Sequence, residues 1–139
     1  MKANELRIGN LIEYKIEDEL DERKEWWEVS KVDFQDLTWL DSNPEDSDFR
    51  PIKLTEEWLL KFWFKYREFL NDFFIKIDNE NILIIEKEVI GFSMFKCEPN
   101  QRKYFLTKIY YVHQLQNLFF SLCGEELTQV SEGENKNFV

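Results

Sequence analysis

Between residues 73 and 110 the chain carries four short stretches rich in β-branched and aromatic residues, separated by polar segments. Such residues favour strands, because their side chains pack well on a pleated surface. All three connections are far shorter than the crossover that two parallel strands require. The pattern therefore predicts an antiparallel four-stranded meander, with strands over residues 73–77, 82–87, 89–97 and 104–110.

A helix is predicted directly before this meander. Thr55 is a favourable N-cap residue, and the acids at 56 and 57 lie in the first turn, where the helix dipole favours negative charge. Apolar residues then recur at helical spacing, at Trp58, Leu59, Phe62, Tyr66 and Phe69. We expect the helix to end near residues 70–71 and to place Trp58 and Phe62 in the core.

A second helix is predicted after the meander, from about Tyr111 to Cys123. It carries one apolar stripe that fits one face of a sheet, at Val112, Leu115, Leu118, Phe119 and Leu122. Gly124 is the expected stop signal. The segment 131–139 is mostly polar, and we expect it to fray.

The N-terminal region indicates three short strands, over residues 11–16, 26–32 and 37–40, with polar connections. The predicted fold class is therefore α+β: a small, curled three-stranded N-terminal sheet, a helix, an antiparallel four-stranded meander and a C-terminal helix. We expect a single domain over residues 1–139. It comprises an acidic β-rich subregion (1–53), a helix–sheet–helix subregion (54–130) and the frayed tail.

Negative charge is concentrated at the start of the chain. The formal net charge is −10, and residues 1–57 hold 17 acidic and 8 basic residues, a balance of −9. Such a surface repels phosphate backbones, which argues against direct nucleic-acid binding by this half. It would attract a protein partner with a basic surface. The plainer interpretation is that the charge only keeps the protein dissolved.

We predict a partner-binding surface from the two acidic runs and an adjacent tryptophan pair. Trp26 and Trp27 would point to opposite faces of a strand, so that one of them is available as an anchor. The alternative is that both are buried. Trp63 is a further candidate for an exposed aromatic residue. The candidate residues are Glu17, Asp18, Glu19, Asp21, Glu22, Trp26, Trp27, Asp41, Glu45, Asp46 and Asp48.

No motif indicates catalysis, a metal or a cofactor, so we expect a protein that is not an enzyme. The only histidine, His113, has no nucleophile motif to work with, and Cys123 lies about 15 Å along a helix from it. A calcium loop counted from Asp41 fails, because position 6 is not glycine and position 12 is Ile52. Cys97 lacks further ligands for zinc. The four glycines are isolated, so no phosphate loop is present.

The sequence also indicates a cytoplasmic protein without membrane segments. The N-terminus has no apolar stretch of signal-peptide length. No apolar run approaches the roughly 18 residues of a spanning helix. In the cytoplasm both cysteines are expected to be reduced thiols.

Three blocks of sequence resemble a family of small, uncharacterised proteins common in Bacteroidetes genomes, particularly in phages and prophages. They are residues 5–10 (ELRIGN), 51–62 (PIKLTEEWLLKF), and 111–120 with 124–128 (YVHQLQNLFF, GEELT). Family members continue the central block with Gly-Phe, whereas this chain has Trp63 and Phe64, which favours a longer helix here.

The resemblance implies a role in a mobile element and no known enzymatic activity. Small acidic phage proteins of this kind are often inhibitors of host defence, such as anti-CRISPR proteins. The resemblance therefore suggests an inhibitor of a defence nuclease, and a type VI-B RNA-guided RNase is one target that fits a Bacteroidetes host. The alternative is a structural or self-associating accessory protein of a phage.

Overall fold

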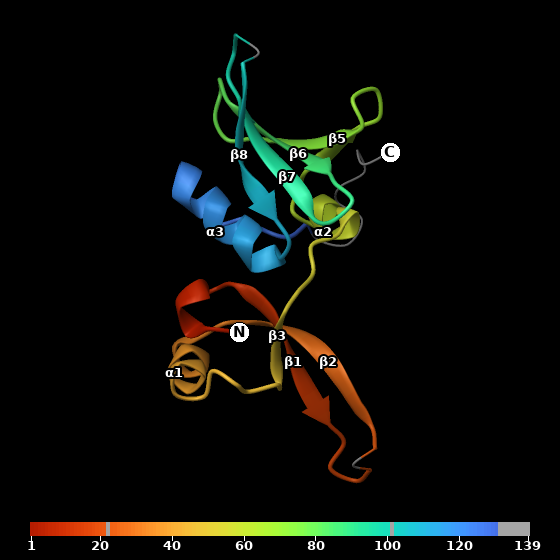
Figure 1. The fold of residues 1–139 in the computed structure, drawn as a ribbon, viewed down its shortest axis with the longest axis vertical. Coiled ribbons are helices and arrows are strands. Elements are labelled where there is room, and N and C mark those ends of the chain that lie inside the picture. Colours follow the sequence, from red (N-terminus) through yellow and green to blue (C-terminus); the bar gives the residue numbers. More distant parts are fainter. Residues whose placement is uncertain (22, 101, 131–139) are drawn as a thin grey trace. The chain divides into compact units, whose positions relative to one another are not determined.

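The computed structural model describes residues 1–21, 23–100 and 102–130 (Figure 1). It confirms the α+β class, with two antiparallel sheets of three and five strands. The chain divides into two compact units, and the boundary in sequence falls after Lys53. Unit 1 comprises residues 1–53 together with 111–113, and unit 2 comprises 54–110 and the chain from Gln114 onward. That all of it forms one domain stays a prediction, and the predicted frayed tail, 131–139, lies outside the described residues.

The sheet of unit 1 has the order β2-β1-β3, with β1 at Leu11–Glu17, β2 at Glu25–Lys31 and β3 at Phe49–Pro51. A short 3-10 helix, η1, covers Ala3–Glu5. The turn before β1 depends on Asn10, which is fully buried and whose Oδ1 accepts a hydrogen bond from the Arg7 N–H at 2.6 Å. Gly9 adopts a φ of +93° there, a conformation that glycine reaches without strain.

The predicted strand over 37–40 is wrong, because this segment lies in helix α1 (Phe34–Ser42). The helix begins with a reciprocal cap between two aspartates. Asp33 accepts a hydrogen bond from the Asp36 N–H, and the Asp36 carboxylate accepts one from the Asp33 N–H. Such a capping box satisfies two backbone donors at the helix start and outweighs the strand propensity of the following residues. The third strand of the sheet is β3 instead, which pairs with β1.

The sheet of unit 2 is a simple meander in the order β4-β5-β6-β7-β8, with all neighbours antiparallel. Four of its strands lie where the sequence predicts them. The fifth, β4, is formed by residues expected in the first helix. The strands are β4 (Lys65–Arg67), β5 (Asp72–Lys76), β6 (Ile82–Lys87), β7 (Phe92–Cys97) and β8 (Lys103–Ile109).

Helix α2 (Glu56–Lys61) is shorter than predicted, although its start is confirmed. The Thr55 side chain accepts a hydrogen bond from the Trp58 N–H at 3.3 Å. The helix stops because the chain turns at Trp63, whose φ is +71°. That turn buries both Phe62 and Phe64 completely. In a continuing helix, side chains two residues apart would point to nearly opposite sides, so the helix would not bury both.

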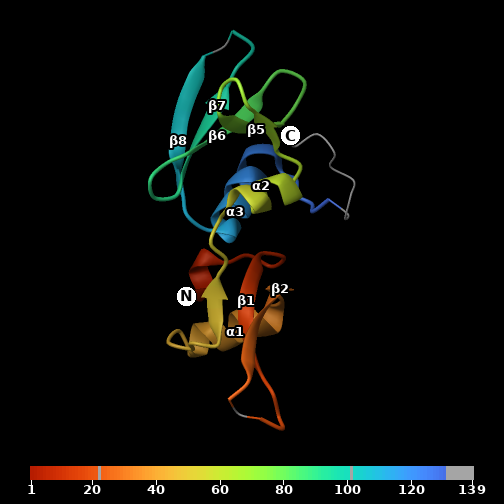
Figure 2. The same cartoon turned by 90° about the vertical axis from the view of Figure 1, so that its right-hand side faces the viewer.

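Helix α3 (Val112–Cys123) matches its prediction and ends at Gly124, whose N–H donates to the Phe120 carbonyl. In both views α2 and α3 lie on the same side of the five-stranded sheet (Figures 1 and 2). The core of unit 2 lies between these two helices and the sheet. Its fully buried side chains include Leu59, Leu83, Ile85, Met94, Ile109 and Leu115. Strand residues that alternate with these face the opposite side of the sheet.

Candidate functional site

The predicted acidic surface lies in unit 1, and its first part is the tip of the β1–β2 hairpin. Glu17 ends β1 directly opposite Glu25, a like-charge pair that disfavours strand pairing. Lys15 relieves it in part through an ion pair with Glu25 at 3.3 Å. Glu17 and Glu19 are exposed, and among the described residues neither carboxylate has a hydrogen-bond or ion-pair partner. These two acids are therefore available to a cation from outside.

Two other acids at the tip shape the turn. Asp18 accepts a hydrogen bond from the Leu20 N–H at 2.9 Å, and Asp21 accepts one from the Arg23 N–H at 3.1 Å. Asp21 also forms an exposed ion pair with Arg23. Asp18 and Asp21 thus have a structural role in the turn. The predicted site residue Glu22 lies outside the described residues.

Trp26 and Trp27 occupy opposite faces of the sheet, because Trp26 pairs with Ile16 and Trp27 with Lys15. The Trp26 side chain is 44% exposed, and its indole N–H donates to Glu28. Trp27 is half-buried, since the Arg50 guanidinium lies 3.8 Å from the centre of its ring. Trp26 is accordingly the better candidate for an anchor.

The second acidic segment follows α1. Asp41, Glu45 and Asp48 are exposed. Asp46 is half-buried. Its carboxylate already accepts hydrogen bonds from the Trp39 indole at 2.5 Å and from the Asp48 N–H at 2.8 Å. The hydrogen bond from Trp39 is the main reason that the pKa of Asp46 lies below its ordinary value. Asp46 therefore stabilises the loop and is less available to a partner than its neighbours.

The two acidic segments meet at one end of β1. The Asp48 carbonyl accepts a hydrogen bond from the Lys15 N–H at 2.8 Å, two residues before Glu17. The hairpin tip continues past this point, beyond the start of β3 (Figure 1). We name the exposed acids at this end, Glu17, Glu19 and Asp48, the acidic end of unit 1.

Sequence reasoning missed two exposed aromatic residues on α1. Phe34 is 72% and Trp39 is 52% exposed. Together with polar neighbours they line a hollow of about 420 Å³ formed by Phe34, Gln35, Thr38, Trp39, Ser42 and Asn43. The signal that could have revealed this face is the Asp33–Asp36 spacing, which is typical of a helix start. Trp63, also considered as an exposed aromatic residue, is 38% exposed in unit 2.

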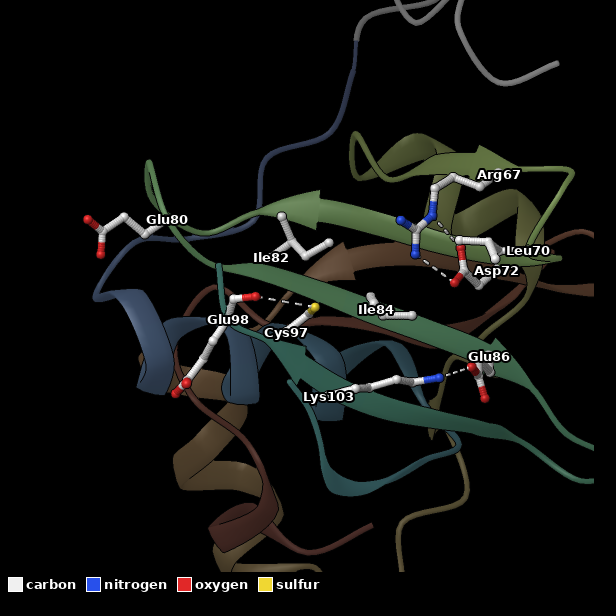
Figure 3. A pocket seen from close by; sticks show the side chains of 10 residues that line it. All are labelled: Arg67, Leu70, Asp72, Glu80, Ile82, Ile84, Glu86, Cys97, Glu98 and Lys103. Carbon is white, nitrogen blue, oxygen red and sulfur yellow. Dashed lines mark hydrogen bonds and ion pairs between the residues drawn. The ribbon is translucent and has the colours of Figure 1, made fainter. Parts of the chain in front are cut away.

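Unit 2 has a larger cavity that the sequence does not predict, on the sheet face opposite α2 and α3. Figure 3 shows its lining, and its volume is about 530 Å³. Asp72 is buried and accepts two hydrogen bonds of 2.7 Å from Arg67, which raise the pKa of Arg67. Lys103 forms an ion pair with Glu86. The remaining lining residues are Leu70, Glu80, Ile82, Ile84, Cys97 and Glu98.

His113 is buried at the start of α3 and stacks on Tyr111, with ring centres 5.8 Å apart. Its Nδ1 atom has no hydrogen-bond partner among the described residues, and burial lowers its pKa. Neither free cysteine lies in a candidate metal site, since the described part of the chain has no group of three or more His, Cys, Asp or Glu that could hold an ion. The helices in that part of the chain are all too short or too polar to cross a membrane.

Comparison with known proteins finds no matching family model, curated protein or solved structure. The resemblance to the phage and prophage family therefore stays a prediction. The acidic end of unit 1 and the cavity of unit 2 are the two candidate sites of this chain.

Proposed function

We propose that this protein is a non-enzymatic binding protein that inhibits a nucleic-acid enzyme of a host defence system by covering its basic surface. The observation that carries the proposal is the meeting of two acidic segments at one end of β1, where Glu17 and Glu19 have no partner among the described residues. Carboxylates placed in this way compete with phosphates for lysine and arginine side chains.

Exposed aromatic residues in the same unit supply the apolar part of the contact. Trp26 lies on the acidic hairpin, and Phe34 and Trp39 flank the hollow on α1. Large aromatic side chains dominate binding energies at interfaces, whereas charges at the rim mainly accelerate and orient association. We infer that the partner presents basic side chains together with at least one apolar residue.

The resemblance to a phage and prophage family suggests the biological setting. In this setting the partner is a CRISPR effector, for which a type VI-B RNA-guided RNase is a candidate, and the site of action is the cytoplasm. The mechanism requires no catalytic group in this chain. The effector would lose access to guide or target RNA because carboxylates occupy its phosphate-binding cations.

The test is affinity capture from a Bacteroidetes lysate with the full chain as bait, at low and high salt, read by mass spectrometry. We expect a nucleic-acid enzyme that is retained at low salt and weakened at high salt. The variant Glu17→Lys/Glu19→Lys leaves the turn-forming Asp18 and Asp21 in place and should abolish this retention. Inhibition of the captured enzyme is then assayed with its guide and target.

The matched control is Glu68→Lys/Glu125→Lys, which changes the net charge equally at two exposed acids of unit 2. It should retain the partner. Equal retention by the wild type and both variants would contradict the proposal, as would equal loss in both variants, because the effect would then follow net charge and not the acidic end.

Self-association as a phage accessory protein is the second candidate function, and the edge of the unit 2 sheet favours it. β8 is a seven-residue edge strand in which Phe105 is 58% exposed. Long, exposed edge strands readily pair with another chain. Sedimentation of the pure protein distinguishes the two functions, because only self-association predicts a mass that rises with concentration.

A further inference from the structure

The cavity of unit 2 has ends of different charge. At one end lie the turns β5–β6 and β7–β8, which contribute Glu80 and Glu98. Neither carboxylate has an ion-pair partner among the described residues. Asp78 fixes the first turn by accepting hydrogen bonds from the N–H groups of Glu80 and Asn81. Among the lining residues, this end therefore carries two carboxylates and no cation.

The other end holds two cations, Arg67 and Lys103, each of which has hydrogen-bond donors left for a ligand. The Arg67 guanidinium binds Asp72 through Nε and Nη2, and its third nitrogen, Nη1, has no hydrogen-bond partner among the described residues. Figure 3 shows that this nitrogen points away from Asp72, toward the Ile82 side of the cavity. Buried Asp72 holds the guanidinium in place, which makes the free N–H groups a preorganised site for an anion.

Lys103 forms the second cation of this end. Its side chain runs back along the sheet to Glu86, and its ammonium lies 4.2 Å from the centre of the Phe95 ring. The bulge between β7 and β8 at Met94 and Phe95 sets the position of this ring. An ammonium has three donors, so the ion pair with Glu86 leaves Lys103 capable of a further hydrogen bond.

The floor between the two ends is apolar. Ile82 and Ile84 alternate with the core residues of β6 and so face the cavity, and Leu70 borders it with 54% of its surface exposed. Along β6 the lining runs four residues, from Ile82 to Glu86, which is about 13 Å, so the cavity suits an elongated molecule. The volume of about 530 Å³ lies in the range of small-molecule sites.

The geometry points to a site for a linear zwitterion of the ω-amino carboxylate class. Its carboxylate accepts hydrogen bonds from Arg67 Nη1, its methylene chain lies on the isoleucine floor, and its ammonium is held by Glu98 and Glu80. A simple carboxylate would lack a partner for the negative end, and a simple amine would leave Arg67 unused. The assignment is independent of the proposed function, which concerns unit 1.

Cys97 provides a direct measurement, because it lines the cavity while Cys123 does not. The intact protein is alkylated with iodoacetamide, and both cysteines are followed by peptide mass spectrometry. The probes are 4-aminobutanoate, 6-aminohexanoate and 8-aminooctanoate, with octanoate and octylamine as single-ended controls. We expect 8-aminooctanoate to protect Cys97 alone, at a concentration about tenfold lower than either single-ended control, because each charged contact accounts for at least that factor.

Substitutions at both ends test the placement. Glu98→Gln should reduce the difference between the concentrations of 8-aminooctanoate and octanoate that protect Cys97. Arg67→Gln/Asp72→Asn removes both charges together, so that no carboxylate is left buried without a partner. This variant should reduce the difference between the concentrations of 8-aminooctanoate and octylamine that protect Cys97. Lys108→Gln, on β8 outside the cavity, is the control and should change neither.

Absence of Cys97 protection by all three amino carboxylates would overturn the assignment. Equal protection by 8-aminooctanoate, octanoate and octylamine would also overturn it, since the polar ends would then have no role. If both end variants leave the protection of Cys97 unchanged, the probe binds elsewhere, and this result would also overturn the assignment.

Discussion

The indole N–H of Trp39 donates a hydrogen bond to Oδ2 of Asp46, seven residues later in the chain, at 2.5 Å. This contact fixes the loop after α1 and lowers the pKa of Asp46. Trp39→Phe and Asp46→Ala should each lower the free energy of unfolding by about 1 kcal/mol, since the bond is charge-assisted but partly hydrated. In a double-mutant cycle by urea denaturation the double variant should cost less than the sum.

The pH dependence has a definite sign. Because the folded-state pKa of Asp46 is lowered, its contribution is present above the ordinary carboxyl pKa and is lost as pH falls through the folded-state value. Asp46→Ala should therefore approach wild-type stability in acid. Asp48→Ala is the control, because Asp48 contributes to this loop through its backbone. Full additivity of Trp39→Phe and Asp46→Ala would contradict the coupling.

The two adjacent tryptophans of β2 should separate binding from stability. Trp27→Ala removes the ring beneath Arg50 and should cost about 1 kcal/mol more in unfolding free energy than Trp26→Ala. Trp26→Ala should weaken partner binding about tenfold or more, as expected of an exposed anchor. Urea denaturation and titration against the captured partner measure the two effects. Equal affinities of both variants would exclude Trp26 as the anchor.

Two glycines with the same φ of +74° form a matched pair. A Cβ on Gly91 would lie 2.6 Å from the Tyr110 ring and 2.9 Å from the Ile109 carbonyl, whereas one on Gly124 meets no atom of the described residues within 4 Å. Gly124→Ala should cost only the backbone strain, about 1 kcal/mol. Gly91→Ala adds the steric clash and should lower thermal stability distinctly more. Equal melting temperatures would contradict this difference.

His113 should make stability depend on pH near neutrality. Burial lowers its folded-state pKa, against a smaller opposing effect of Glu5, so the unfolded chain binds the proton more readily. Stability is therefore full above the unfolded pKa of about 6.5 and decreases as pH falls below it, by at most about 1.4 kcal/mol per pH unit. His113→Phe retains a ring against Tyr111 and should remove this slope between pH 7.5 and 5. An unchanged slope would assign it to other groups.

The meander and α3 were predictable because their connections, apolar stripe and Gly124 are local features. The start of α2 was predictable for the same reason, through Thr55. Its end was not, because burial of Phe62 and Phe64 around the turn at Trp63 is a tertiary effect. The strand expected over 37–40 failed because the mutual cap of Asp33 and Asp36 decides the local structure there.

For the candidate sites, charge counting located the acidic segments but could not separate their roles. Asp18, Asp21 and Asp46 resemble Glu17 and Glu19 in sequence, yet their carboxylates bind backbone or indole N–H groups. The cavity of unit 2 could not be predicted from the sequence. Its lining comes from several strands and turns, and only the folded sheet defines their register.

Unit 1 is not continuous in sequence. Lys53 pairs with Tyr111 in an isolated bridge, and the Val112 N–H donates to the Ile52 carbonyl, so the chain returns to this unit after completing the five-stranded sheet. During synthesis the β1–β2 hairpin can form as soon as it emerges from the ribosome. These closing contacts must wait until residue 113 has followed, by which time the strands of unit 2 are already available to pair. A nascent chain stalled shortly after Lys53 would thus display the acidic hairpin on an unfinished unit.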